Sequence, residues 1–150
     1  SSPRHTVAPE KRGMSMIFQS YAIWPNMTVG QNVAFGLKLR KLPGADIDRR
    51  VDRILDVVRM KHLKDRYPAE LSGGQQQRVA IARAIITDPT ILVADEPTGD
   101  LGRTSAEEVL DLIDRLNREL GKTIIMVTHD PHAAAKARSI RQLDKGELAT

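Results

Sequence analysis

Short apolar runs that end in polar residues alternate with helical patterns in the second half of the chain, and this alternation limits its fold more than any other feature. Residues 91–94 form a continuous apolar run that ends at Asp95 and Glu96. A second run, 123–127, ends at Thr128 and His129. Continuous apolar runs of this length are typical of parallel strands that are buried on both faces. The sequence therefore predicts an α/β fold with a mainly parallel sheet.

Capping patterns predict where several helices begin. Thr28 and Gln31 fit a capping box, as do Ser105 and Glu108, and Gly121 is a typical C-terminal stop. The expected helices begin near residues 28, 46, 75, 105 and 131, and the expected strands are 14–18, 91–94, 123–127 and 139–143. No strand is expected between the strands 14–18 and 91–94. We therefore predict a helical subdomain at about 26–87, inserted into an α/β core made of 14–20 and 88–150.

Composition excludes several classes of protein. The chain has 150 residues, of which 41% are hydrophobic and 28% charged, as in an ordinary globular domain. It has no cysteine, so it has no disulfide framework and no cysteine metal site. The net charge of +4 comes from basic residues interleaved with acidic ones, and no nucleic-acid partner is predicted. No apolar run approaches the roughly 18 residues of a membrane span.

The carboxylates that follow the run 91–94 form the first candidate site. Ligands of open α/β sheets bind at the carboxyl ends of the strands. There, Asp95 could hold Mg²⁺, which prefers oxygen ligands, and Glu96 could orient or deprotonate a water. A strand that merely ends in a polar turn has the same pattern. His129 follows the next apolar run, and it is a further candidate, for contact with a phosphate or with the attacking water.

A glycine-rich segment is the second candidate site. Ser72, Gly73, Gly74 and Gln75 precede a run of good helix formers. Glycine allows the backbone to approach a ligand closely, and the free amides of a helix N-terminus attract anions. The alternative interpretation is an ordinary N-cap serine followed by a glycine turn.

Together these residues resemble the ATPase subunits of ATP-binding cassette (ABC) transporters. The segment 71–75 is similar to the family signature, 91–96 to Walker B, 18–20 to the Q-loop, and His129 to the switch histidine. The resemblance implies a P-loop NTPase-like parallel sheet with an inserted helical subdomain. It implies ATP and Mg²⁺ as cofactors. It also implies two kinds of partner: transmembrane permease subunits and a second nucleotide-binding subunit, as a homodimer or heterodimer. The implied location is the cytoplasm, peripherally on the cytoplasmic face of the cell membrane.

The same resemblance implies a role for each matching residue. Glu96 would be the catalytic base, and His129 would stabilise the γ-phosphate region. Gln19 would contact Mg²⁺ or the attacking water, and Asp95 would hold Mg²⁺ through water. The segment formed by Ser72, Gly73, Gly74 and Gln75 would contact the ATP that is held by the opposite protomer.

Two departures from the family pattern restrict these expectations. The Walker A motif G-x-x-x-x-G-K-[ST] is absent, because Leu116 stands where its first glycine would have to precede Gly121-Lys122-Thr123. The sequence is therefore expected to begin after Walker A, to lack the Walker A strand, and to be inactive by itself. Gly102 replaces an aspartate that helps to couple the two protomers in the family. A catalytically inactive scaffold and a non-transport ABC protein remain the alternative functions.

Overall fold

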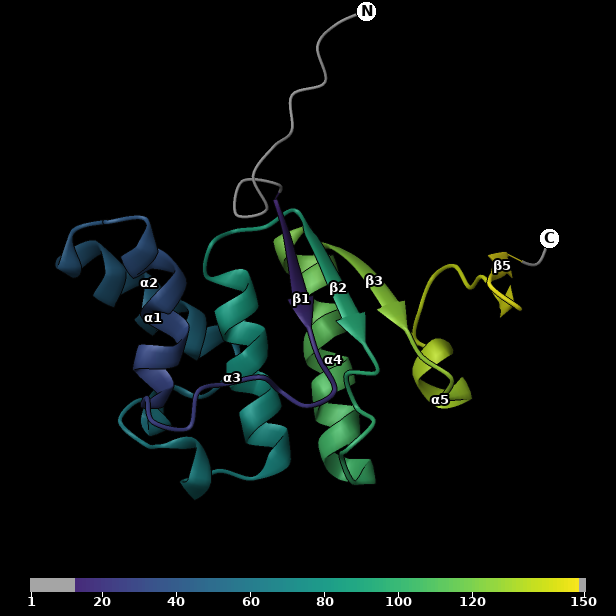
Figure 1. The fold of residues 1–150 in the computed structure, drawn as a ribbon, viewed down its shortest axis with the longest axis horizontal. Helices are drawn as coiled ribbons and strands as arrows, with labels where there is room; N and C mark the ends of the chain where they lie inside the picture. The colour runs from purple at the N-terminus through teal and green to yellow at the C-terminus, as the bar shows by residue number, and fades with distance from the viewer. Residues whose placement is uncertain (1–12, 149–150) are drawn as a thin grey trace, which may run out of the picture.

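A computed structural model describes residues 13–148, and three parallel strands in the order β1–β2–β3 form its central sheet. The predicted α/β fold with a parallel sheet is thereby confirmed. Figure 1 shows the strands side by side, with α3 and α4 behind them and α1 and α2 beyond α3. The elements are, in order, β1 Met14–Ile17, α1 Val29–Leu39, α2 Gly44–Val57, the 3₁₀ helices η2 Lys61–Leu63 and η3 Pro68–Glu70, α3 Gly73–Ile85, β2 Ile91–Asp95, α4 Arg103–Leu120, β3 Thr123–Val127, α5 Pro131–Ala134, β4 Leu143–Asp144 and β5 Glu147–Leu148.

One of the two predicted capping boxes is present and the other is wrong. At α1 the Thr28 side chain accepts from the Gln31 amide, and the Gln31 side chain accepts from the Thr28 amide. The helix α4 begins at Arg103 with Gly102 as its N-cap, so Ser105 lies inside the first turn and caps nothing. The turn that follows β2 sets this start, because the Ala106 amide already bonds to the Gly102 carbonyl. Gly121 ends α4 in the left-handed conformation, as predicted.

The expectation that the strands are buried on both faces is also wrong. Leu92 and Ala94 point toward the helices and are buried. On the opposite face Met16 is 44% exposed and Ile125 is 49% exposed. In the described part of the chain, α3 and α4 lie on one face of the sheet only, which explains why buried and exposed side chains alternate along the strands (Figure 1).

The predicted last strand, 139–143, is wrong as well. After α5 the next strand begins at Leu143, and it forms a small antiparallel ribbon, β4–β5, that is separate from the central sheet. Lys145 and Gly146 both have positive φ values, 50° and 84°, in the two-residue turn of this ribbon. Two consecutive positive φ values match the twist of a tight hairpin.

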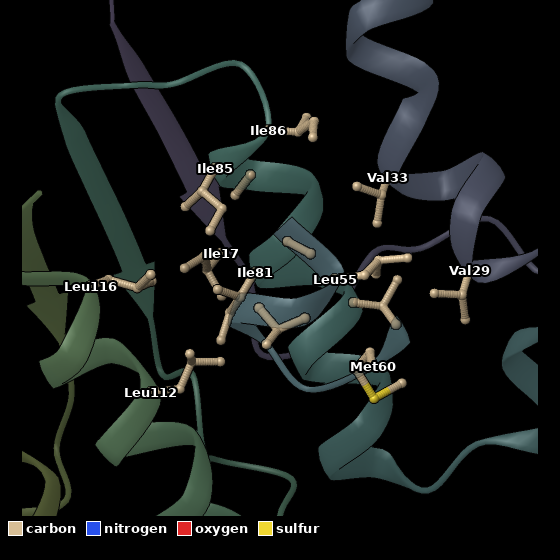
Figure 2. Packing of buried hydrophobic residues seen from close by; sticks show 14 of the residues in the cluster. Ile17, Val29, Val33, Leu55, Met60, Ile81, Ile85, Ile86, Leu112 and Leu116 are labelled. Atoms are coloured by element: carbon tan, nitrogen blue, oxygen red, sulfur yellow. The ribbon is translucent and has the colours of Figure 1, made fainter. Parts of the chain in front are cut away.

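Helix α3 is the centre of the hydrophobic core. It packs against α1, α2, α4 and β1. Figure 2 shows Ile81 and Ile85 of α3 between Leu55 of α2 and Leu116 of α4.

The residues between β1 and β2 contain helices and no strand in the described chain. The predicted division into a helical subdomain and an α/β core stays a prediction. The helix boundary near residue 46 falls two residues earlier, at Gly44.

None of the helices in residues 13–148 has the length and apolar content needed to span a bilayer.

Candidate functional site

The carboxyl ends of the three parallel strands bring together residues from distant parts of the sequence. Gln19 lies two residues after β1, Glu96 directly follows β2, and His129 lies two residues after β3. The Glu96 amide donates to the Val127 carbonyl at 2.8 Å, which extends the pairing of β2 and β3 by one step. Glu96 then adopts a left-handed φ of 46°, and this turns its side chain toward β3.

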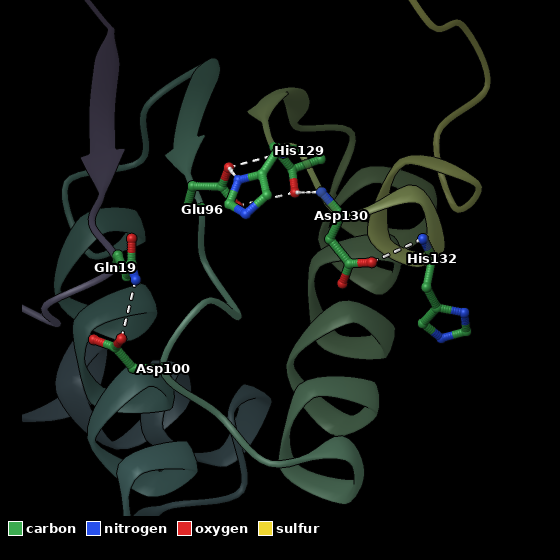
Figure 3. A network of polar contacts seen from close by, with 7 residues as sticks. Gln19, Glu96, Asp100, His129, Asp130 and His132 are labelled. Atoms are coloured by element: carbon green, nitrogen blue, oxygen red, sulfur yellow. Dashed lines mark hydrogen bonds and ion pairs between the residues drawn. The ribbon is translucent and has the colours of Figure 1, made fainter.

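The side chain of Glu96 is clamped by the two residues that follow β3. Its Oε2 atom accepts a hydrogen bond from the Thr128 hydroxyl at 3.0 Å, and its Oε1 atom accepts one from the His129 backbone amide at 2.8 Å. The His129 ring also bonds to Oε1 through Nδ1, as Figure 3 shows. A carboxylate is only an acceptor, so Nδ1 carries the proton in this pair. The structure therefore brings two predicted catalytic residues, Glu96 and His129, into direct contact.

The environment of Glu96 favours its ionised form. Burial acts to raise the pKa of this carboxyl, but the bonds from the His129 amide, the His129 ring and the Thr128 hydroxyl together hold the pKa below its usual value. The Glu96 side chain is only 19% exposed, whereas the His129 side chain is 91% exposed. The histidine ring therefore lies at the surface, while the glutamate side chain is mostly enclosed.

Among the hydrogen bonds of the described residues, none joins Gln19 to Glu96. The Nε2 atom of Gln19 donates to the Asp100 carboxylate at 3.0 Å, and Figure 3 shows this pair apart from the Glu96–His129 pair. Gly99 makes the arrangement possible, because a Cβ atom at that position would lie 2.7 Å from the Gln19 amide group. The amide nitrogen is engaged with Asp100, which leaves the Gln19 oxygen available as an acceptor.

Asp95 is the last residue of β2, and it is exposed. No group of three or more His, Asp or Glu side chains comes together as a metal site within residues 13–148. Mg²⁺ typically keeps several waters and is held by one or two carboxylates plus substrate phosphates. The carboxylate of Asp95, with the oxygen of Gln19, fits that donor set.

The glycine-rich segment forms the N-terminus of α3, which begins at Gly73 and not at Gln75 as predicted. Ser72 is its N-cap: the Ser72 hydroxyl accepts from the Gln75 amide at 3.2 Å, and the Gln75 side chain accepts from the Ser72 amide at 3.0 Å. This is a complete capping box, so the N-cap interpretation describes the local geometry. The capping box uses the third amide of the helix, and the first two, of Gly73 and Gly74, point out of its N-terminus.

Both glycines are also required by packing inside this chain. A Cβ atom at Gly73 would lie 2.8 Å from the Tyr21 hydroxyl and 3.3 Å from Leu101. At Gly74 it would lie 2.9 Å from Cβ of Ser105. Burial and the charge of Asp100 raise the pKa of Tyr21, so its hydroxyl stays neutral against the helix N-terminus. Close approach to a ligand is therefore not the only reason for glycine here, and the segment has no described contact with Asp95, Glu96 or His129.

Three residues of the site were not predicted from the sequence. Thr128 bonds to Glu96, Asp100 bonds to Gln19, and Gln77 donates from α3 to the Phe18 and Pro97 carbonyls. Gln77 had a detectable signal, because it is a polar residue in the stripe of α3 that otherwise carries small and apolar side chains. Asp100 had none, since nothing near it in the sequence indicates a bond to residue 19.

Comparisons with known proteins agree with this architecture. The family model described as ABC transporter matches residues 2–99. The sulfate/thiosulfate import ATP-binding protein CysA of Nocardia farcinica is 46% identical over 143 residues, which are 95% of this chain and 43% of that protein. The maltose/maltodextrin import ATP-binding protein MalK of Yersinia pseudotuberculosis is 42% identical over 144 residues, 95% of this chain and 39% of that protein.

Solved structures of similar fold are ATP-binding cassettes. The dimeric post-hydrolysis state of the cassette MJ0796 bound to ADP and Pi has a TM-score of 0.78 and 35% identity, with coverage of 91% of this chain and 61% of that one. The structure of cbiO1 from Clostridium perfringens, part of the transporter complex cbiONQ, has a TM-score of 0.85 and 33% identity, with coverage of 93% and 56%. The chain spans about two fifths of the length of the two import proteins.

Proposed function

The chain belongs to the ABC transporter family, and on that premise we propose that it forms part of an ATP-hydrolysing subunit that powers solute transport through nucleotide-driven dimerisation. Its partners would be transmembrane permease subunits and a second nucleotide-binding subunit. It would act in the cytoplasm, peripherally on the cytoplasmic face of the membrane. The observation that carries the proposal is the pairing of Glu96 with Thr128 and His129 at the carboxyl ends of β2 and β3.

Glu96 is the proposed general base. A base must be ionised before it accepts a proton. The hydrogen bonds that lower the pKa of Glu96 favour the ionised form and at the same time make it a weaker base, so the base role relies on release of the His129 ring from Oε1. Each carboxylate oxygen has two acceptor positions, and Oε2 uses one of them for Thr128. The other can accept a hydrogen bond from the attacking water. The exposed ring of His129 would turn from Oε1 toward the γ-phosphate region when nucleotide is present.

Asp95 and Gln19 are the proposed contacts to Mg²⁺. The ion would neutralise charge on the phosphates. Asp95 would hold it through a water, and the oxygen of Gln19 would contact the ion or the attacking water. The bond from Gln19 to Asp100 supports this role, because it fixes the amide nitrogen and thereby the direction of the oxygen.

The glycine turn at Ser72, Gly73, Gly74 and Gln75 is the proposed contact to the nucleotide of the partner subunit. Ser72 is exposed, and the first amides of α3 are suited to an oxyanion. Binding of two nucleotides between two subunits would then couple ATP binding to dimerisation.

A catalytically inactive scaffold is the second candidate. The sequence lacks the motif G-x-x-x-x-G-K-[ST], whose amides and lysine hold the phosphates of a nucleotide. Calorimetric titration of this chain with Mg-ATP tests its intrinsic affinity. Binding should be weak or absent, and a dissociation constant in the low micromolar range would contradict that expectation.

The catalytic assignment is tested in a version of the chain extended at its N-terminus with a G-x-x-x-x-G-K-[ST] segment. Glu96→Gln keeps the shape of the side chain and removes the base, so hydrolysis should fall by about 10²–10⁴-fold with ATP binding retained. Glu108→Gln, at an exposed residue of α4, is the matched control and should leave turnover unchanged. Turnover of the Glu96→Gln variant within a few-fold of the parent would remove Glu96 from the base role.

The composite site is tested in the Glu96→Gln background, in which bound ATP is not consumed. Ser72→Arg should abolish ATP-induced dimerisation in size-exclusion chromatography, because the arginine would fill the space of the partner's γ-phosphate. Binding of ATP to the monomer should persist. A dimer that still forms with arginine at position 72 would show that the glycine turn is an ordinary helix cap.

A further inference from the structure

Gln77 is a fully buried polar residue in the second turn of α3. Its Nε2 atom lies 3.0 Å from the Phe18 carbonyl and 2.6 Å from the Pro97 carbonyl. Carbonyl oxygens only accept hydrogen bonds, so the amide must present its two hydrogens to them, one to each. The orientation of this side chain is therefore determined by its partners.

The two carbonyls belong to the two turns that carry the proposed catalytic residues. Phe18 directly precedes Gln19 after β1, and Pro97 directly follows Glu96 after β2. These turns are 59 and 20 residues away from Gln77 in the sequence. One nitrogen atom therefore joins both turns to the helix that begins at the glycine turn.

The other end of the amide is enclosed as well. Within residues 13–148 the Oε1 atom of Gln77 is buried and has no hydrogen-bond partner. An apolar side chain at this position would leave the Phe18 and Pro97 carbonyls without their shared donor. Asparagine would keep a terminal amide, but its side chain is one methylene shorter than that of glutamine.

We propose that Gln77 is a positioning residue, whose buried carboxamide sets the separation between the turn that bears Gln19 and the turn that bears Glu96. The catalytic meaning of this separation rests on the proposed function. The separation itself is a geometric property of the chain, so its test does not require ATP hydrolysis. Failure of the bridge and failure of the proposed ATPase function are therefore distinguishable.

The absence of cysteine allows this separation to be measured by spin labelling. Cysteines introduced at two exposed positions, Ser20 and Asp95, would carry one nitroxide beside each turn. In the Gln77→Leu variant the distance distribution between the labels should broaden relative to the labelled parent. The matched control is Gln76→Leu, since the hydrogen bond that Gln76 donates within residues 13–148 goes to the Leu71 carbonyl, just before its own helix. The control should keep the parent distribution.

Hydrogen exchange in the unlabelled chain separates positioning from general stability. The Tyr21 amide donates to the Phe18 carbonyl and the Gly99 amide donates to the Glu96 carbonyl, so these amides report on the two turns. In Gln77→Leu both should exchange faster by about tenfold or more, the effect of a lost hydrogen bond. Amide exchange in β2 and α4 should change by less than amide exchange in the turns. The variant and the parent should have similar midpoints of thermal unfolding.

Three results would overturn the proposal. One is an unchanged label distribution in Gln77→Leu, and another is faster exchange that is uniform over the turns, β2 and α4, which would indicate a role in stability alone. If the variant does not fold, the unmodified chain decides the question by NMR. Both Nε2 hydrogens of Gln77 should exchange far more slowly than those of an exposed glutamine, and exchange at the exposed rate is the third such result.

Discussion

The contact between the glycine turn and α4 leads to a stability prediction for Gly74→Ala. A Cβ atom at Gly74 would lie 2.9 Å from Cβ and 3.0 Å from Oγ of Ser105. Carbon atoms in contact are usually about 3.5–4.0 Å apart. Cβ of Ser105 is attached directly to the backbone of α4, so it cannot move without a shift of one of the two helices. Overpacking of this kind costs about 1–3 kcal/mol.

Two effects compete in this variant. Alanine is favoured over glycine in a helix by up to about 1 kcal/mol. The loss from overpacking exceeds that gain, so we expect Gly74→Ala to lower the free energy of unfolding by about 1–2 kcal/mol. For a chain of 150 residues, this corresponds to a fall of roughly 3–6 °C in the midpoint of thermal unfolding. Gly44→Ala is the control, because a Cβ atom at Gly44 would meet nothing within 4 Å.

Thermal and urea unfolding of four proteins measure the contact itself: the parent, Gly74→Ala, Ser105→Gly and the double variant. Ser105→Gly removes both atoms that the new methyl group would meet. The double variant should therefore lose less free energy of unfolding than the two single variants lose in sum, by about 1 kcal/mol or more. A Gly74→Ala protein as stable as the parent would refute the reasoning. A double variant with purely additive losses would refute it as well.

Three further predictions follow from the contacts of the site. Hydrogen bonds hold the pKa of Glu96 below its usual value, so their contribution to stability is present at neutral pH and is lost as the pH falls through the folded-state pKa. Thr128→Val removes one of these bonds and should make the acid-induced loss of stability smaller. Midpoints of unfolding measured from pH 7 downward test this. Gly99→Ala should displace the Gln19 side chain and break its bond to Asp100, and unchanged NMR shifts of the Gln19 amide group would contradict this. Gly102→Asp should add a side-chain cap to α4 and stabilise the chain by about 0.5 kcal/mol, and equal or lower stability in urea would count against it.

Local patterns predicted the elements better than their boundaries. The capping box at Thr28 and Gln31 was correct because its two hydrogen bonds join residues three positions apart. The same pattern at Ser105 and Glu108 was wrong, although the residues suit it equally. The start of α4 is set by the turn after β2, which places Gly102 as the N-cap. Capping preferences alone do not distinguish the two starts, because glycine is also a common N-cap residue.

Burial of the strands depended on what covers them. An apolar run such as 123–127 indicates a strand, but it does not specify how many of its faces are covered. In the described chain the helices lie on one face of the sheet, so Ile125 is half exposed despite its sequence context. Gln77 shows the opposite case, since a polar residue is fully buried because two carbonyls from other segments meet it.

The sequence by itself determined the order along the chain of the three strands of the central sheet and of the main helices, and the residues that stand at the ends of those strands. Only the tertiary structure decided which of these residues meet. Glu96 bonds to His129 across 33 positions, and Gln19 bonds to Asp100 across 81. Such contacts depend on the order of the strands in the sheet, on the left-handed turn at Glu96 and on the close packing at Gly99. Hydrogen bonds act over about 3 Å in space, and separation in the sequence does not specify that distance.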